Sequence, residues 1–250
     1  MTAATMFAAL GLQAAYLTAP ITIDTVRIGN AGNAADTRIL AEGGTVGKGA
    51  VSYEYSIGTT SVTAGQYTAF LNAVASTSDD YGLYNAEMYS DANGCGISAS
   101  TVGGVTTYAT TKGDNMPVNF VSVYDAMRFC NWLTTGDTES GVYMLGGAAN
   151  DISLVVRNDA AWQAGGVAIA SLDEWYKVAF YNGATGVYNT YANGTDTAPV
   201  AGTEANYANA VGTITDVFTY STESFYGVLD LNGNTWEKTD TVTGSSTYVR

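Results

Sequence analysis

Oxygen-bearing side chains are concentrated around a glycine turn in the segment GVLDLNGNTWEKTD, residues 227–240. Asp230 and Glu237 carry carboxylates, and Gly233 permits a tight turn that aims main-chain carbonyls inward. Thr235 offers such a carbonyl if its neighbour Trp236 faces the core. Calcium takes about six to eight oxygen ligands from carboxylates, amides and carbonyls. The residues fit either a calcium site or an ordinary turn with a core Trp and a solvated Glu, and their types alone leave both open.

Other site chemistry is limited by what the chain lacks. It contains no His, which excludes a Ser-His-Asp triad, a Cys-His pair and His-ligated zinc or iron. Catalysis would have to use Cys, carboxylates, Tyr or Lys. The two cysteines, Cys95 and Cys130, allow one disulfide and no Cys-rich metal site. Whether these two pair is left open by the sequence.

The charge and composition narrow the partners and the fold class. The net charge is −14 and the pI about 4.1, so the chain repels phosphate backbones and nucleic acid is not an expected partner. It attracts cations, and an acidic, Lys-poor surface is common on exported proteins. Hydrophobic residues make up 46% of the 250, which supports a real core. With 29 Gly, 18 Tyr and 13% charged residues, a loop-rich fold is favoured over a helical bundle.

The N-terminus, MTAATMFAALGLQAAYLTAP, is apolar and rich in small residues. It is too short and too rich in Ala and Thr for a stable membrane span. It is similar to the apolar part of a signal peptide without the basic region, and a core strand or helix is the alternative. We expect an extracytoplasmic or secreted protein. Residues 1–20 would be a signal-peptide remnant or N-terminal extension, and residues 21–250 a single domain.

Three helices are predicted from apolar periodicity and capping residues. The first begins after Thr63, a fair N-cap, and the second after Ser122, which forms a capping box with Asp125. The third begins after Ser171, which forms a cleaner capping box with Glu174. The expected buried faces are Tyr67, Phe70, Leu71 and Val74; Ala126, Met127, Cys130 and Leu133; and Trp175, Val178 and Ala179.

Strand-like alternation occurs in AVSYEYSIG, residues 50–58, and in GVYML, residues 141–145. The intervals 79–116 and 182–224 are rich in Gly, Asn, Thr and Tyr and are expected to be long ordered loops. The sequence therefore predicts an α+β fold with about three helices, short antiparallel strands and much irregular chain.

Four segments in order resemble the sulfatase-modifying-factor family, whose namesake is the formylglycine-generating enzyme. They are YEYSIGTTSVTAGQYTAFLNAVA, MPVNFVSVYDAMRFCNWL, SLDEWYKVAFY and YGVLDLNGNTWEKTD. The resemblance covers about Ala50 to Asp240 and implies a loop-rich variant of the C-type lectin-like fold. The chain departs from the family at Ala170, where Pro is usual, and at Lys238, where Trp is frequent. The segment LVVRNDAAWQAGGVAIA, residues 154–170, resembles a family hairpin that leads into the third helix.

The resemblance implies calcium at the 230–237 segment. The positions that match the family's ligands are Asp230, Gly233, Thr235 and Glu237. A second calcium site of the family matches Asn206 and the carbonyl of Tyr207, with Asp216 as a candidate for the remaining ligands.

The resemblance does not carry over to catalysis. The family's enzyme oxidises a substrate cysteine with O₂ through a pair of cysteines that bind copper(I). These cysteines follow an R-G-G-S-[WF]-like motif, and this chain ends at SSTYVR, about where that motif begins. We therefore expect copper only if a cysteine-bearing tail exists, and a domain that is incomplete at its C-terminus. An iron-dependent branch that uses histidines is excluded by the absence of His.

Two functions follow, and a third is weaker. The first is a non-catalytic, exported, calcium-stabilised domain, expected to be a monomer, that binds an unknown protein or carbohydrate ligand through Tyr- and Asn-rich loops. The second is a fragment of a formylglycine-generating oxidoreductase that oxidises a cysteine in sulfatases. The third is a variable surface receptor, since some proteins of this fold carry hypervariable binding residues near the C-terminal end.

Overall fold

The computed structural model describes residues 4–6, 8–10, 21–38, 47–146, 156–243 and 246–249. The helices are α1 (Ala64–Val74), α2 (Glu87–Ser90), α3 (Val123–Thr135), α4 (Asp159–Gln163) and α5 (Leu172–Phe180). The strands up to the third helix are β1 (Ala4–Met6), β2 (Ala8–Leu10), β3 (Thr25–Ile28), β4 (Tyr55–Gly58), β5 (Ile97–Val102) and β6 (Val105–Thr110). The later strands are β7 (Val167–Ile169), β8 (Tyr181–Asn182), β9 (Val187–Tyr188), β10 (Trp236–Thr243) and β11 (Ser246–Val249). The chain is an α+β protein with short strands, as predicted.

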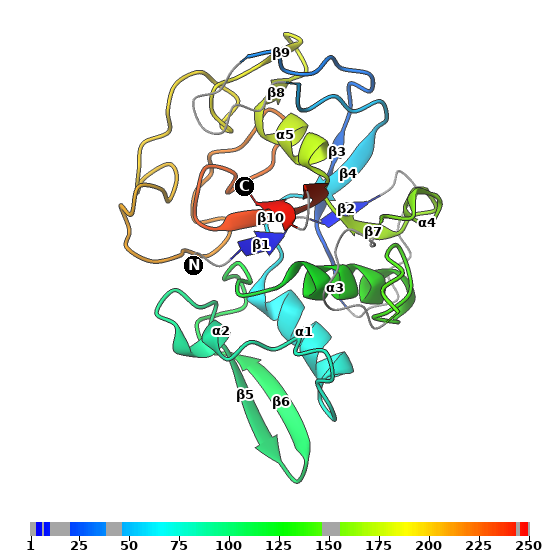
Figure 1. The fold of residues 1–250 in the computed structure, drawn as a ribbon. Helices are drawn as coiled ribbons and strands as arrows, with labels where there is room; N and C mark the ends of the chain where they lie inside the picture. The colour runs from blue at the N-terminus through cyan, green and yellow to red at the C-terminus, as the bar shows by residue number, and fades with distance from the viewer. Residues whose placement is uncertain are drawn as a thin grey trace.

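Two small sheets form the centre of the fold. One has the order β3-β4-β2-β7 with antiparallel pairs, and its inner strand β2 aligns Ala9 with Ile57 on one side and Ala8 with Ile169 on the other. The other has the order β1-β10-β11, in which β1 runs parallel to β10. Figure 1 shows α3 on one side of these strands and α5 on the other. Strand β2 comes from the segment for which a signal peptide or a core strand was expected, and its removal on export stays a prediction.

The three predicted helices are confirmed, and their starts are set by local capping. Thr63, Ser122 and Ser171 each accept a hydrogen bond from the backbone N–H three residues on, and the residue there bonds back to the cap. The predicted apolar faces are buried, except that Val74 is half-buried. Aromatic rings join α1 to α3, because Phe70 lies 5.4 Å from Phe129 between ring centroids. The short helices α2 and α4 were not predicted.

The strand predicted over residues 141–145 is wrong. Only an isolated bridge forms there, between Tyr143 and Arg157. The Asn131 side chain takes the place of a neighbouring strand. Its Oδ1 accepts from Tyr143 N at 2.9 Å, and its Nδ2 donates to Tyr143 O at 2.7 Å. The alternation of apolar residues therefore comes from packing of this segment beside helix α3, and the segment does not form the edge of a sheet.

The interval 79–116 is not a long loop. It contains α2 and the hairpin β5–β6, which projects from the body of the molecule (Figure 1). The turn is Gly103-Gly104, with φ of 61° and 83°, which suits the tight two-residue turn of a twisted hairpin. The interval 182–224 is irregular beyond β8 and β9, as predicted.

The segment 154–170 does not form the expected hairpin. Its first two residues lie outside the described part of the chain, and the rest forms α4 and β7. Strand β7 finds its partner in β2, far away in the sequence, instead of within the segment.

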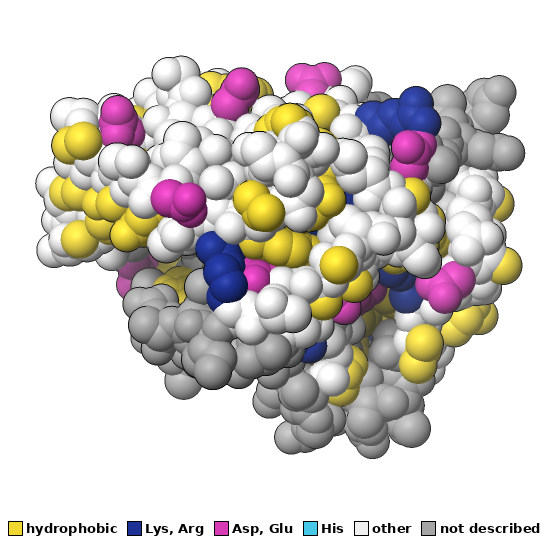
Figure 2. All heavy atoms as spheres, turned by 90° about the horizontal axis from the view of Figure 1, so that it is seen from above, with side chains coloured by type: hydrophobic (Ala, Val, Ile, Leu, Met, Phe, Trp, Pro, Cys, Tyr) yellow, Lys and Arg dark blue, Asp and Glu magenta, His cyan; other side chains and the backbone are white. Residues whose placement is uncertain are grey.

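Within the described part of the chain, no helix reaches the length and hydropathy of a membrane span. On the face shown in Figure 2, acidic side chains stand singly among neutral and hydrophobic ones and do not form one block.

Candidate functional site

The turn before β10 is held tightly against a neighbouring loop. Gly233 has φ of 114°, and a Cβ added to it would lie 2.4 Å from Asn206 O. That carbonyl accepts from Asn234 N at 2.6 Å, and Thr235 N donates to Gly233 O at 2.8 Å. Only glycine fits the backbone conformation and the close approach together.

Asn234 fastens the turn to the loop around Thr215. Its Oδ1 accepts from Asn206 Nδ2 at 3.0 Å and from Thr215 N at 2.9 Å, and its Nδ2 donates to Thr215 O at 2.9 Å. Its φ of 65° is left-handed, a conformation that Asn tolerates better than most residues. Sequence reasoning gave this residue no role, although its place after Asn-Gly was a signal for a left-handed turn.

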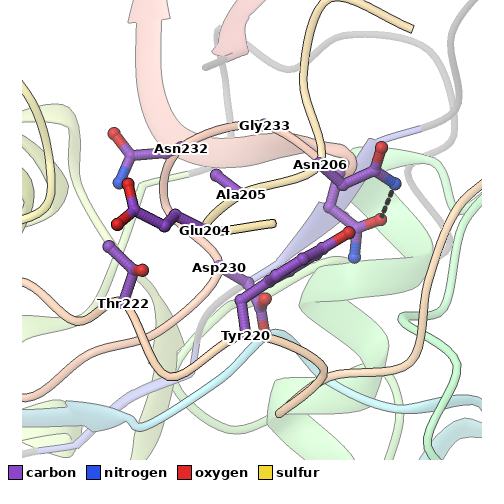
Figure 3. Close-up of a pocket in the computed structure, with 9 residues that line it drawn as sticks. Glu204, Ala205, Asn206, Tyr220, Thr222, Asp230, Asn232 and Gly233 are labelled. Carbon is purple, nitrogen blue, oxygen red and sulfur yellow. Dashed lines mark hydrogen bonds between the residues drawn. The ribbon is translucent and has the colours of Figure 1, made fainter. Parts of the chain in front are cut away.

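Two hollows lie beside this turn. The first is a cavity of about 10 Å³, room for one water or ion. Figure 3 shows Asn232, Glu204 and Thr222 on one side of it and Asn206 on the other. Asp230 also lines this cavity.

The second hollow is an open groove of about 860 Å³, called the groove below. Its walls come from the loops around Asn93 and Phe120, from the loop 206–214, from Trp175 on α5 and from the start of β10. Of these walls, only residues 206 and 207 and the 233–237 turn were singled out from the sequence. The others come from segments remote in the chain, so no local pattern marks them.

The two carboxylates of the turn are both desolvated. Burial raises the pKa of Asp230 to about 6, and a hydrogen bond from Phe218 N at 3.4 Å offsets this only in part. Burial also raises the pKa of Glu237 well above its usual range, and the nearby charge of Asp230 adds to the rise. Glu237 Oε1 has no hydrogen-bond partner among the described residues, and the side chain is 3% exposed.

The expected orientation of Trp236 is wrong, and so is the alternative of a solvated Glu237. Trp236 is 49% exposed and lines the groove, whereas Glu237 points inward. Successive residues of a strand face opposite sides, and at the start of β10 only one of these sides is covered by the core. In β10 the inward positions are taken by Glu237 and Thr239.

The structure brings the six predicted ligand residues to one place. Asn206, Tyr207, Gly233, Thr235 and Glu237 line the groove, and Asp230 lines the small cavity together with Asn206 and Gly233. Asp216 is exposed and lines neither hollow.

A cation fits the chemistry of this donor set. The described residues hold no group of three or more His, Cys, Asp or Glu side chains that could bind a metal ion. Calcium needs no such group, because main-chain and amide oxygens supply many of its ligands. A buried carboxylate oxygen without a donor is costly, and a cation would remove that cost. The orphaned Glu237 Oε1 beside Asp230 therefore fits calcium.

The two cysteines are free and fully buried. Burial raises the pKa of both thiols, and in Cys95 hydrogen bonds from the backbone oppose the rise only in part. A thiol of raised pKa stays protonated at neutral pH, whereas copper(I) is bound by thiolates. These two residues do not fit a copper site.

The family model described as Sulfatase-modifying factor enzyme 1-like domain matches residues 26–248. The match includes the five helices of the described residues, the turn before β10 and the residues that line the groove. A search of curated proteins found no match to the chain.

Proposed function

Because this chain belongs to the sulfatase-modifying factor enzyme 1-like family, we propose that it is a non-catalytic member that works outside the cytoplasm. In this proposal calcium stabilises the domain, which binds a protein or carbohydrate ligand. The observation that carries it is Glu237, a carboxylate buried to 3% exposure whose Oε1 has no partner in the described chain.

Calcium would be held by the carboxylates of Asp230 and Glu237 with the carbonyls of Gly233 and Thr235. A second ion would use Asn206 and the carbonyl of Tyr207. Bound calcium would supply positive charge to a place where burial otherwise penalises two carboxylates. It would tie the turn to the start of β10 and so hold one wall of the groove in place.

The burial and the raised pKa values of the two thiols support the proposal that the chain is non-catalytic. The family's oxidation of a substrate cysteine needs reactive, metal-binding thiolates, and Cys95 and Cys130 are fully buried with raised pKa values. Conversion of a Cys-containing sulfatase peptide by this chain supplied with copper would overturn this part.

Thermal unfolding with calcium or with a chelator tests the calcium site. Binding to the folded state alone at about 100-fold over Kd stabilises by about 2.7 kcal/mol. For a domain of this size that is a rise in Tm of about 5–11 °C. Glu237→Gln should abolish the rise, because it removes the charged ligand.

The matched control is Glu87→Gln, which removes the same charge from an exposed position on α2. It should keep the full rise in Tm. An unchanged Tm at saturating chelator in the unmutated protein would overturn the calcium site.

A further inference from the structure

We propose that the groove binds a neutral oligosaccharide, with Trp236 as the platform on which a sugar ring stacks. This inference rests on the proposed function, since it names the ligand class of a binding domain.

The polar lining of the groove is mostly neutral. Five of its residues are asparagines, two are threonines, and the only charged ones are Asp91 and Glu237. No Lys or Arg lines it within the described chain. The protein's own side chains would therefore offer a phosphorylated, sulfated or carboxylated ligand only like charge, in a protein of net charge −14. The one positive charge beside the groove would be the calcium of the proposed function, whose charge Asp230 and Glu237 would balance.

The asparagines of the groove fall into two groups, those whose side chains bond to the protein and those that are exposed. The side chains of Asn119, Asn206 and Asn234 bond to the protein itself and fix the walls. Asn93 and Asn209 are exposed at the groove. An amide donates and accepts at once, which suits hydroxyl groups that do the same.

The apolar lining is aromatic and open. Trp236 is 49% exposed, and half-buried Phe120 and Tyr207 lie on other walls. Trp175 is buried, and its indole N–H has no partner among the described residues. A buried indole N–H normally finds an acceptor. A ligand with flat apolar faces and hydroxyl acceptors satisfies both features.

Backbone strain gathers at the same walls. Phe120, Ala208, Asn209 and Asn234 have φ between 53° and 65° and line the groove. A bulky residue such as Phe is rarely left-handed, and such outliers cluster at ligand sites. The strain therefore points to walls shaped for a ligand.

An extended peptide fits less well. Peptides often bind by adding a strand to a free sheet edge. Strand β10, which forms one wall, pairs with β1 from Trp236 and with β11 from Lys238 onward. Only its short start, at Trp236 and Glu237, lacks a described partner on the β11 side, which is too short an edge for an added strand. Recognition must then come mainly from side chains, as for a sugar.

The experiment screens the whole chain, with calcium present, on an array of neutral, sulfated and sialylated oligosaccharides and of peptides. The strongest neutral ligand is then titrated by calorimetry and tryptophan fluorescence. Trp236→Ala should weaken its binding about tenfold or more, as loss of an aromatic anchor does. Trp236→Phe keeps a ring and should retain most of the affinity. Phe225→Ala, an aromatic of similar exposure outside the groove, should leave it unchanged.

No binding to any neutral oligosaccharide would overturn the inference. So would preferential binding of peptides or sulfated glycans, or equal affinity of Trp236→Ala. The calcium-dependent Tm of the same samples reports on the proposed function and on folding of the variants. If calcium still raises Tm while no neutral glycan binds, only the ligand class is wrong.

Discussion

Gly233→Ala tests whether the turn before β10 is pressed against the 206–207 loop. The added Cβ would lie 2.4 Å from Asn206 O and 2.9 Å from Tyr207 Cβ, in a backbone at φ of 114°. A left-handed non-glycine residue costs about 1–3 kcal/mol. Overlap with a packed backbone adds about 1–3 kcal/mol, because Asn206 O cannot move without weakening its bond to Asn234 N. We expect a loss of about 2–6 kcal/mol in the free energy of unfolding.

The matched control is Gly113→Ala. Gly113 has φ of 106°, and a Cβ there meets nothing within 4 Å. Gly113→Ala should lose only the stability that a left-handed backbone costs a non-glycine residue, about 1–3 kcal/mol in the free energy of unfolding. Urea unfolding of both variants, with chelator present, measures the difference. If Gly233→Ala is no more destabilised than Gly113→Ala, the packing of the turn described above is wrong. In calcium the gap should widen if the turn holds the ion.

The remaining predictions concern buried titratable groups. Burial raises the pKa of Asp240 to about 6, against the attraction of Arg157 and the hydrogen bond from Tyr143. The folded state then binds its proton more tightly than the unfolded state, so stability falls as pH rises from about 4 to 6. Asp240→Asn should flatten that fall by up to about 3 kcal/mol, measured by urea unfolding across pH, and an unchanged profile would contradict the assignment. Cys95 and Cys130 should not react with a thiol reagent in the native protein and should both react in denaturant, and fast native labelling would show that the thiols are accessible.

Local signals in the sequence were sufficient for the three longer helices, α1, α3 and α5. Ser122 with Asp125 and Ser171 with Glu174 satisfy the free N–H groups of a helix start within one turn, so they need no distant partner. The turn signal of the hairpin at Gly103-Gly104 was equally local. The Gly-, Asn-, Thr- and Tyr-rich composition of residues 79–116 nevertheless favoured a loop, and that prediction was wrong.

Only the part of the site that lies within one segment of the sequence could be predicted from it. The segment from Asp230 to Glu237 is a turn followed by a strand, and its polar residues pointed to oxygen ligands. Which face is buried depended on the pairing of β10, so Trp236 was assigned to the wrong side. Phe120 and Trp175 enter the groove from other parts of the fold, and no spacing in the sequence connects them to it.

The position of β2 between β4 and β7 has a consequence for the kinetics of folding. Ala8 pairs with Ile169, which lies 161 residues later in the chain (169 − 8). The four-stranded sheet therefore cannot close until most of the chain has been made. Long-range pairing of this kind slows folding and leaves apolar strand edges exposed meanwhile. Until β4 and β7 have been made, the alanines of β2 have no partner strands, so this is the stage of folding at which a chaperone would act.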